Sequence, residues 1–458
     1  MIKKRVLPIM LVLVMISGAL NGCGAGLQSG NGLSAESKMT EPEEKGAEGK
    51  TGEEKGAEGK MNETEGKAGE SLDLLTANKL DPGEIICIDY SEPSMEPVQE
   101  FAYKLLSCNL KKKNPVFSPV SAYLALCMAA NGAQGKTKKE LQRVLGEDFL
   151  CLPDYVMNLL PQKKEGFTLE VANSVWMDQE FHVEKPWLTQ AVSLFDASVY
   201  EADLDTAAAR KDINAWVSSQ TNKMIPKLLS ANLERSTRLA LLNALYFQAE
   251  WENKFEVHYT AEGEFRLDNG SVQKVPMMYQ LYSGCEYVKD ASCEGVVLPY
   301  KDSSYAFVAV KPVGKKSIRK WYQSYSAEKL QKLIAGRKSM DVDLGLVKFQ
   351  ARCSQDLVGS LKKMGIARAF DPVKADFTRL GTSSQGNSLY IGKVLQEAVV
   401  EVAEEGTKAA AATVVSMEDG CGMIDPVPVV FDRSFLYLIM DMEHGMPVFM
   451  GIMDQPTE

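Results

Sequence analysis

Near the C-terminus, a run of small side chains follows a glycine, and this run limits what the chain can fold into. It begins after Gly406 and contains four consecutive alanines followed by Thr413, Val414 and Val415. Alanine favours helices, whereas threonine and valine favour strands. In a strand, the odd-numbered residues would form a face that can be buried throughout, and Lys408 would face solvent on the other side. The sequence therefore predicts a strand that can insert into a crowded sheet; an alanine-rich surface helix is the alternative.

Short motifs also occur along the rest of the chain in a fixed order. They lie at Asn114–Ser121, Ala125–Met128, Gly132–Thr137, Asn173–Trp176, Ile213–Val217, Asn243–Phe247, Val275–Met278, Leu298–Tyr300, Ala375–Phe377, Phe431–Phe435 and Phe449–Gly451. Together with the run after Gly406, this series resembles the serpin family of protease inhibitors. The resemblance covers most of the chain. It implies an α+β serpin fold with three β-sheets, about nine helices and an exposed reactive loop.

The resemblance makes the segment around Gly406 the hinge of the reactive loop. The hinge residues are Glu404, Glu405, Gly406, Thr407, Lys408, Ala409, Ala410, Ala411, Ala412 and Thr413. In inhibitory serpins, a protease cuts the loop and forms an acyl-enzyme, after which the loop inserts into the main sheet. By this resemblance Gly406 is the pivot and Thr407 enters first. The attached protease is carried to the opposite pole and deformed, a release of stored strain for which serpins are a standard example.

The position of the scissile bond follows from a count along the loop. Inhibitory members place it at the seventeenth residue from the first hinge glutamate, and counting from Glu404 gives Gly420 and the bond Gly420–Cys421. The segment after this bond is longer than is usual in the family, so Asp419, Cys421 and Met423 remain alternatives. The two glycines around Cys421 make this part of the loop adaptable to a protease cleft.

The loop composition also limits the kind of protease that can be engaged. From Ala409 to Asp432 the chain contains no lysine or arginine. The acidic S1 pocket of a trypsin-like protease would therefore find no cation to pair with. We expect targets that prefer small or apolar residues, which are elastase-like or subtilisin-like proteases, with papain-like enzymes as the second choice.

Five further residues match the serpin shutter under the main sheet and the breach where the loop enters it. They are Ser118, Ser121, Asn243, Gln396 and Trp251. Gln396 stands where the family usually has a histidine. A glutamine amide both donates and accepts hydrogen bonds, so we expect Gln396 to bridge Asn243 and the serines. Because glutamine does not titrate, we expect no pH-sensitive shutter.

The N-terminus has the layout of an export signal. Lys3, Lys4 and Arg5 precede an apolar run from Val6 to Ile16, and a small residue precedes Cys23. This layout predicts a signal peptide over residues 1–22 and resembles the bacterial lipoprotein cleavage box, with Cys23 as the lipidated first residue of the mature chain. The apolar run is shorter than the ~20 residues that span a bilayer. We expect the lipid to be the only membrane anchor and the protein to face the extracellular space; ordinary secretion is the alternative.

A polar segment follows Cys23. Residues 36–70 contain 11 Glu and 6 Lys, and no aromatic residue occurs from Gly24 to Asp89. Such a segment buries too little apolar surface to offset the entropy of ordering it. We therefore expect residues 23–96 to form a disordered tether and residues 97–458 to form one serpin domain.

Composition disfavours several other functions. The net charge is −10 and no dense basic stripe occurs, which argues against nucleic acid as a partner. The chain has three histidines, His182, His258 and His444, and no nucleophile elbow, zinc-protease motif or phosphate-binding glycine loop. We expect no enzyme activity, no catalytic residue, no cofactor and no metal. The eight cysteines besides Cys23 lack the CxxC spacing of metal sites, and we expect mostly free thiols.

Three functions remain to be weighed. The first is suicide-substrate inhibition of serine endopeptidases, with cysteine endopeptidases as a second class, by a monomer. The second is that of a non-inhibitory serpin that binds a ligand or partner at the surface. Such members commonly carry bulky or charged residues in the hinge, and this hinge has none on its inward face. The third, an unrelated surface adhesion lipoprotein, would require the series of motifs to be a coincidence.

Overall fold

The computed structural model describes residues 12–18, 71–73 and 93–456, apart from 148, 150, 161, 224, 302–303, 315, 384–388 and 408–424. This part of the chain contains nine α-helices and two short 3₁₀ helices. The helices are α1 (Glu96–Ser107), α2 (Pro119–Asn131), α3 (Gly135–Leu145), α4 (Leu152–Leu159), α5 (Lys185–Phe195), α6 (Ala207–Gln220), α7 (Ile318–Gln323), α8 (Ala327–Ala335), α9 (Val358–Met364), η1 (Val257–Tyr259) and η2 (Arg368–Phe370).

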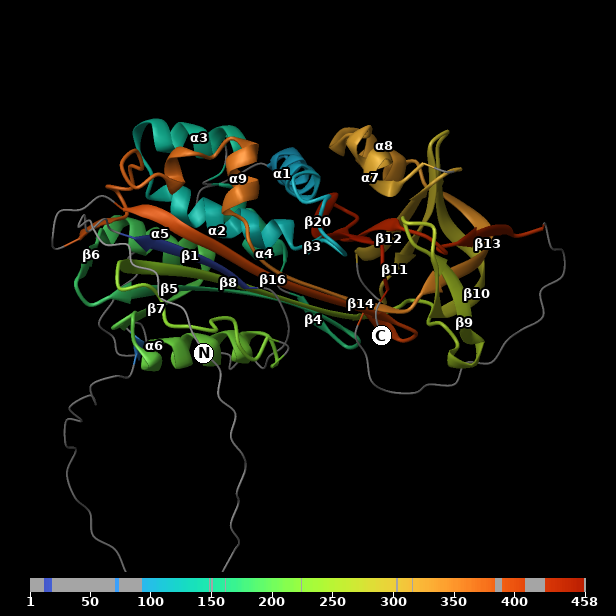
Figure 1. Ribbon diagram of the computed structural model, residues 1–458, viewed down its shortest axis with the longest axis horizontal. Helices are drawn as coiled ribbons and strands as arrows, with labels where there is room; N and C mark the ends of the chain where they lie inside the picture. Colours follow the sequence, from blue (N-terminus) through green and yellow to red (C-terminus); the bar gives the residue numbers. More distant parts are fainter. Residues whose placement is uncertain are drawn as a thin grey trace, which may run out of the picture. The chain divides into compact units, whose positions relative to one another are not determined.

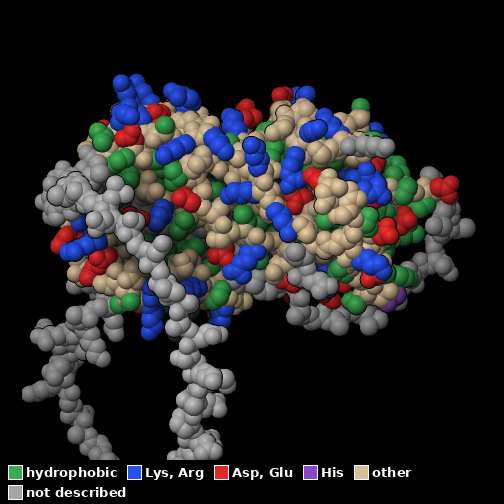
Figure 2. All heavy atoms as spheres, in the orientation of Figure 1, with side chains coloured by type: hydrophobic (Ala, Val, Ile, Leu, Met, Phe, Trp, Pro, Cys, Tyr) green, Lys and Arg blue, Asp and Glu red, His purple; other side chains and the backbone are tan. Residues whose placement is uncertain are grey.

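The burial of the helices follows their sequence periodicity. Val98 and Phe101 of α1 are fully buried, as their helical spacing predicts. In α3, Leu141 is buried and Lys136 is exposed, and Figure 2 shows Lys and Arg side chains gathered over this helix. By contrast, every residue of α2 except Asn131 is buried. A helix that is apolar on all sides runs through the core, and α2 does so.

A large sheet of nine strands forms the centre of the fold. Its strands, in spatial order, are β14 (Phe349–Asp356), β16 (Tyr390–Ala403), then β17 (Gly406–Thr407) and β1 (Val12–Gly18) in one shared position, β8 (Thr237–Glu250), β5 (Phe167–Asp178), β7 (Ala197–Ala202) and β2 (Leu72–Asp73), with β4 (Gln162–Lys164) paired to β5. The pairing of β5 with β7 is parallel, and the other pairings in this sheet are antiparallel.

The two long strands β16 and β8 are separated by a slot one strand wide. Thr407 of β17 lies opposite Ala249 of β8, and Val12 of β1 lies opposite Ala244, five positions further along β8 (249 − 244). Both short strands run antiparallel to β8 and β16, so β1 continues the line of β17. The position between β8 and β16 is thus shared by two short strands, β17 at one end and β1 further along.

Both faces of the large sheet are covered, as the continuous apolar character of β8 requires. Along β8, Leu241 and Leu245 belong to the main core, whereas Leu242 and Tyr246 belong to a smaller core that also contains Ile213 of α6. Figure 1 shows α6 on one side of the sheet and α2 and α5 on the other. The slot between β8 and β16 thus lies between two layers of helix.

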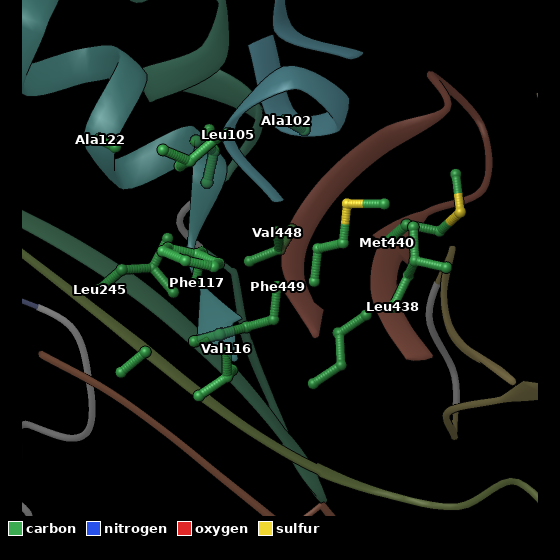
Figure 3. Close-up of a cluster of buried hydrophobic side chains, with 14 of the residues drawn as sticks. Ala102, Leu105, Val116, Phe117, Ala122, Leu245, Leu438, Met440, Val448 and Phe449 are labelled. Carbon is green, nitrogen blue, oxygen red and sulfur yellow. The ribbon is translucent and has the colours of Figure 1, made fainter. Parts of the chain in front are cut away.

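A second sheet of nine strands packs against the helices at one end of the first. Its strands are β18 (Val427–Val430), β13 (Lys338–Val347), β10 (Val272–Lys289), β11 (Cys293–Pro299), β12 (Tyr305–Pro312), β19 (Phe435–Asp441), β20 (Met446–Met453) and β3 (Val116–Phe117), with β9 (Thr260–Arg266) paired to β10. A third sheet pairs β15 (Gly381–Ser383) with β6 (Phe181–Val183). Figure 3 shows Phe117, Phe449 and Leu245 close together, so one core joins β3, β20 and β8.

These observations confirm the predicted fold class: the described residues form an α+β fold with three sheets and nine α-helices. The first helix begins at Glu96, next to the predicted start of the domain. Within the predicted tether, β2 pairs with β7, and the Ser71 backbone N–H and hydroxyl both donate to the Asp212 carboxylate of α6, at 3.1 and 2.7 Å. Among the described residues, no helix has the length and apolar character needed to cross a membrane.

Candidate functional site

The predicted hinge begins with a two-residue turn. Ala403 at the end of β16 pairs with Gly406 at the start of β17, and Glu404 and Glu405 form the turn between them. Gly406 has a φ of +153°, and a Cβ there would lie 2.0 Å from the carbonyl oxygen of Ala249. Glycine is required at this position because the backbone of β8 comes so close.

The first glutamate of the turn is held from two directions. The Lys348 ammonium lies 2.8 Å from Oε2 of Glu404, and the Thr260 hydroxyl donates to Oε1 at 2.9 Å. Burial alone would raise the pKa of Glu404. The hydrogen bonds from Lys348 and Thr260 outweigh burial and leave this pKa below its ordinary value. The carboxylate is therefore charged at neutral pH and fixes one end of the turn.

The second glutamate of the turn has a different partner. The Lys254 ammonium lies 2.8 Å from Oε2 of Glu405 and 2.9 Å from Oε2 of Glu250, the last residue of β8. Burial would lower the pKa of Lys254, but its contacts with the two carboxylates outweigh burial and raise the pKa. The turn is thus contacted by two lysines: Lys254, which follows β8, and Lys348, which directly precedes β14.

Thr407 enters the sheet beneath a buried pair of aromatic rings. The Trp251 ring stacks on the Tyr300 ring, with centroids 4.8 Å apart and planes 7° apart. The hydroxyl oxygens of Tyr300 and Thr407 lie 2.5 Å apart, and the Trp251 indole N–H donates to the Ala403 carbonyl at 2.8 Å. All three side chains are buried. Trp251 therefore contacts the end of β16, directly before the turn of the predicted hinge.

The predicted shutter residues lie together under the middle of the large sheet. Ser118 caps the N-terminus of α2 and accepts a hydrogen bond from the Ser121 N–H at 3.4 Å. The Ser121 hydroxyl donates to Oδ1 of Asn243. The amide of Asn243 then donates to Oδ1 of Asn173 at 2.7 Å, and the amide of Asn173 donates to the Phe195 carbonyl at 2.6 Å. This buried chain of hydrogen bonds ties β8 to α2 and β5.

The bridge expected from Gln396 to Asn243 is not made, which corrects the sequence-based expectation. The Gln396 amide donates instead to the Ser118 carbonyl at 3.0 Å, and its Oε1 has no hydrogen-bond partner among the described residues. Gln396 and Asn243 both lie opposite Leu13 of β1, on its two sides. The strands that carry them are therefore about two strand spacings of 4.8 Å apart, with β1 between them. Asn173 takes the place of Gln396 beside Asn243.

Several predicted residues lie outside the part of the chain that the structure describes. They are the lipidation site Cys23, the hinge residues Lys408, Ala409, Ala410, Ala411, Ala412 and Thr413, the reactive bond Gly420–Cys421, and its alternatives Asp419 and Met423. For these residues the sequence-based expectations stay predictions. The described hinge is Glu404–Thr407, and the structure brings it together with Trp251.

The sequence reasoning missed four residues that contact the hinge directly. They are Lys254, Thr260, Tyr300 and Lys348. Tyr300 is the last residue of the Leu298–Tyr300 motif. The sequence therefore singled out this position but did not predict its contact with Thr407. Nothing in the sequence distinguished Lys254 and Lys348 from other lysines, because lysines are common near strand ends. Their partners are set by the crossing of distant strands.

Other candidate chemistry in the described residues is structural. No group of three or more His, Cys, Asp or Glu side chains there is arranged to hold a metal ion. His444 lies in the turn between β19 and β20, where its ring nitrogen is 2.7 Å from the Asp441 carboxylate. Six cysteines have described surroundings and all are free thiols; burial raises the pKa of Cys127 well above its ordinary value, as expected for a core thiol.

Comparison with known proteins agrees with this geometry. The family model described as Serpin (serine protease inhibitor) matches residues 96–456. A serpin-like protein of Thermococcus kodakarensis is 32% identical over 380 residues, covering 80% of this chain and 87% of its own length. The leukocyte elastase inhibitor of Xenopus tropicalis is 32% identical over 324 residues, covering 68% and 85%. The crystal structure of a thermophilic serpin, tengpin, in the native state has a TM-score of 0.77 and 30% identity, and the match covers 84% of this chain and 100% of that one.

The chain belongs to the serpin family. Members of this family are mostly inhibitors of proteases and are not themselves enzymes. The large sheet, the turn that joins β16 to β17 and the buried chain of hydrogen bonds under the sheet are therefore parts of a serpin fold.

Proposed function

We propose that this serpin is a suicide-substrate inhibitor of serine endopeptidases, with cysteine endopeptidases as the second class. The protease nucleophile attacks the carbonyl carbon of the scissile bond, for which Gly420–Cys421 is the first choice. The carbon–nitrogen bond breaks, the new amino terminus leaves with a proton, and the loop stays attached to the enzyme as an acyl ester or thioester. Water would normally hydrolyse this acyl-enzyme bond and release the protease. Insertion of the loop deforms the protease before this hydrolysis can take place.

The observation that carries this proposal is the state of the hinge. Gly406 and Thr407 already pair with both β16 and β8. A strand can therefore grow from Thr407 along the slot without a new turn having to form. The residues that follow are alanines and a threonine, whose small side chains meet little steric resistance in a packed sheet.

The direction of the short strands between β8 and β16 supports this proposal. β1 occupies it over seven residues in the same direction as β17. A strand of roughly 16 residues rises about 3.3 Å per residue and would carry its far end about 50 Å. A protease attached at that end would move from one pole of the domain to the other.

The loop composition suggests the class of target. Because Ala409 to Asp432 contains no lysine or arginine, we infer elastase-like or subtilisin-like targets with a preference for small or apolar residues, and papain-like targets second. A relative is named a leukocyte elastase inhibitor, which is consistent with this preference.

The N-terminal sequence suggests where inhibition takes place. We infer that Cys23 carries a lipid and that residues 23–96 hold the inhibitor at the cell surface, facing outward. The reactive loop would then be exposed to proteases that reach the cell from outside.

Incubation with a panel of proteases tests the function. The mature protein is mixed with elastase-like, subtilisin-like, papain-like and trypsin-like enzymes and run on a denaturing gel. We expect a covalent complex with at least one elastase-like or subtilisin-like enzyme and none with trypsin-like ones. Cleaved protein with no complex from any enzyme would favour the non-inhibitory, ligand-binding function instead.

A further inference from the structure

The turn at Glu404 and Glu405 is closed by the segment that follows β8. The Trp251 N–H donates to the Glu405 carbonyl at 3.0 Å, and the Phe255 N–H donates to the Glu404 carbonyl at 2.9 Å. Lys254 lies between these two donors in the sequence. The same short segment therefore contacts the turn through two backbone groups and one charged side chain.

Lys254 is placed between two carboxylates that repel each other. Its ammonium is 2.8 Å from Glu405 in the turn and 2.9 Å from Glu250 at the end of β8. Glu250 in turn lies opposite Gly406, the first residue of β17. Without the Lys254 cation, the partly buried carboxylates of Glu405 and Glu250 would lie close to each other at the start of β17. Like charges this close are unfavourable.

We propose that Lys254 is a positioning residue for loop insertion. By joining Glu405 to Glu250, it keeps the turn closed so that insertion starts from a formed hairpin. Opening the turn would add a step in which a loop must be closed again before the strand can grow. Since insertion competes with hydrolysis of the acyl-enzyme, the added step favours hydrolysis. This role rests on the proposed inhibitory function, whereas closure of the turn by Lys254 is independent of it.

The test compares Lys254→Met with Lys274→Met. Lys274 forms an exposed ion pair with Glu262, 2.5 Å apart, and this pair includes neither glutamate of the turn, so its replacement controls for the loss of a surface lysine. Amide hydrogen exchange at Trp251 and Phe255 reports on the turn without any protease. We expect exchange roughly tenfold faster in Lys254→Met and unchanged in Lys274→Met, because exchange follows local opening.

The second readout is the partition between covalent complex and cleaved inhibitor. With a protease that the wild type traps, Lys254→Met should raise the number of inhibitor molecules consumed per enzyme severalfold, while the rate of loop cleavage stays unchanged. Lys254→Arg should restore most of the trapping, because it replaces the cation. Circular dichroism confirms that each variant is folded.

The possible outcomes separate the two ideas. If the wild type traps a protease and Lys254→Met traps it equally well, Lys254 has no positioning role. Faster exchange without a change in partition would likewise limit Lys254 to a structural contact and overturn the proposal. If the wild type traps no protease, the proposed function fails, and the exchange experiment still decides whether Lys254 closes the turn.

Discussion

The hydroxyl groups of Tyr300 and Thr407 touch inside the protein, with their oxygens 2.5 Å apart and both side chains buried. Tyr300 directly follows β11 of the second sheet, and Thr407 is the last residue of β17 in the first sheet. This contact therefore links β17 to the packing between the two sheets. Burial raises the pKa of Tyr300 above its ordinary value, so the phenol stays protonated and can donate to Thr407.

Replacing Thr407 with arginine should convert the inhibitor into a substrate. The position is 4% exposed, and an unpaired charge there would cost about 3–5 kcal/mol. Insertion would stall and the acyl-enzyme would hydrolyse. We expect cleaved protein in place of covalent complex on a denaturing gel with an elastase-like protease. Thr407→Ser, which keeps the hydroxyl, should trap nearly as well as wild type. Near-stoichiometric trapping by Thr407→Arg would contradict insertion through this hinge.

Gly406→Ala should open the pairing of β17. The new Cβ would meet the Ala249 carbonyl oxygen at 2.0 Å, so the backbone must move, at a cost of roughly 1–3 kcal/mol. Trapping should fall and the melting temperature should drop slightly. Gly359→Ala in α9 is the control, because a Cβ there has no atom within 4 Å and alanine favours the helix. Equal behaviour of the two variants would show that the close approach at Gly406 is unimportant.

Cleavage of the loop without trapping should make the protein more resistant to heat. An additional strand in the slot adds ladder hydrogen bonds and buries apolar side chains. We expect a higher melting temperature by calorimetry after limited proteolysis near Gly420. The uncut protein, carried through the same treatment with an inactivated protease, is the reference. An unchanged melting temperature would point to a loop that does not insert.

The contact of Glu404 with Lys348 should weaken in acid. The folded-state pKa of Glu404 is lowered, so the contact contributes stability above the unfolded pKa of about 4.3 and loses it as the pH falls through the folded value. The difference in melting temperature between wild type and Glu404→Gln should therefore shrink from about pH 6 to about pH 3. In a Lys348→Gln background this pH dependence should be smaller. A constant difference across the range would rule out the charged contact.

Replacing Cys23 with alanine should release the protein from the cell. A lipidated amino-terminal cysteine with several acyl chains binds a membrane stably, and alanine cannot be acylated in this way. We expect loss of labelling by a fatty-acid probe and recovery of the protein from the medium. Cys127→Ala, at a buried core position, should remain labelled. Continued labelling of Cys23→Ala would exclude this site of lipidation.

The local sequence predicts the character of single elements. Apolar residues at helical spacing predict α1, and apolar runs predict the strands β8 and β16, because side-chain periodicity is set by backbone geometry alone. The hinge was identified by the resemblance to serpins, and its role stays a prediction. Gly406 and Thr407 were predicted as pivot and first inserted residue, and the structure gives the reason for the glycine in the close approach of Ala249. The order of motifs was enough to predict the fold class.

The contacts of the hinge were decided only by the tertiary structure. Lys254, Tyr300 and Lys348 lie 151, 107 and 56 residues before Glu405, Thr407 and Glu404 (405 − 254, 407 − 300, 404 − 348). The sequence around these residues does not distinguish them, because their partners depend on which strands lie side by side in the folded chain. The same reason explains Gln396: its residue type permits a bridge to Asn243, but β1 lies between the two strands that carry them, and the Gln396 amide donates to the Ser118 carbonyl instead.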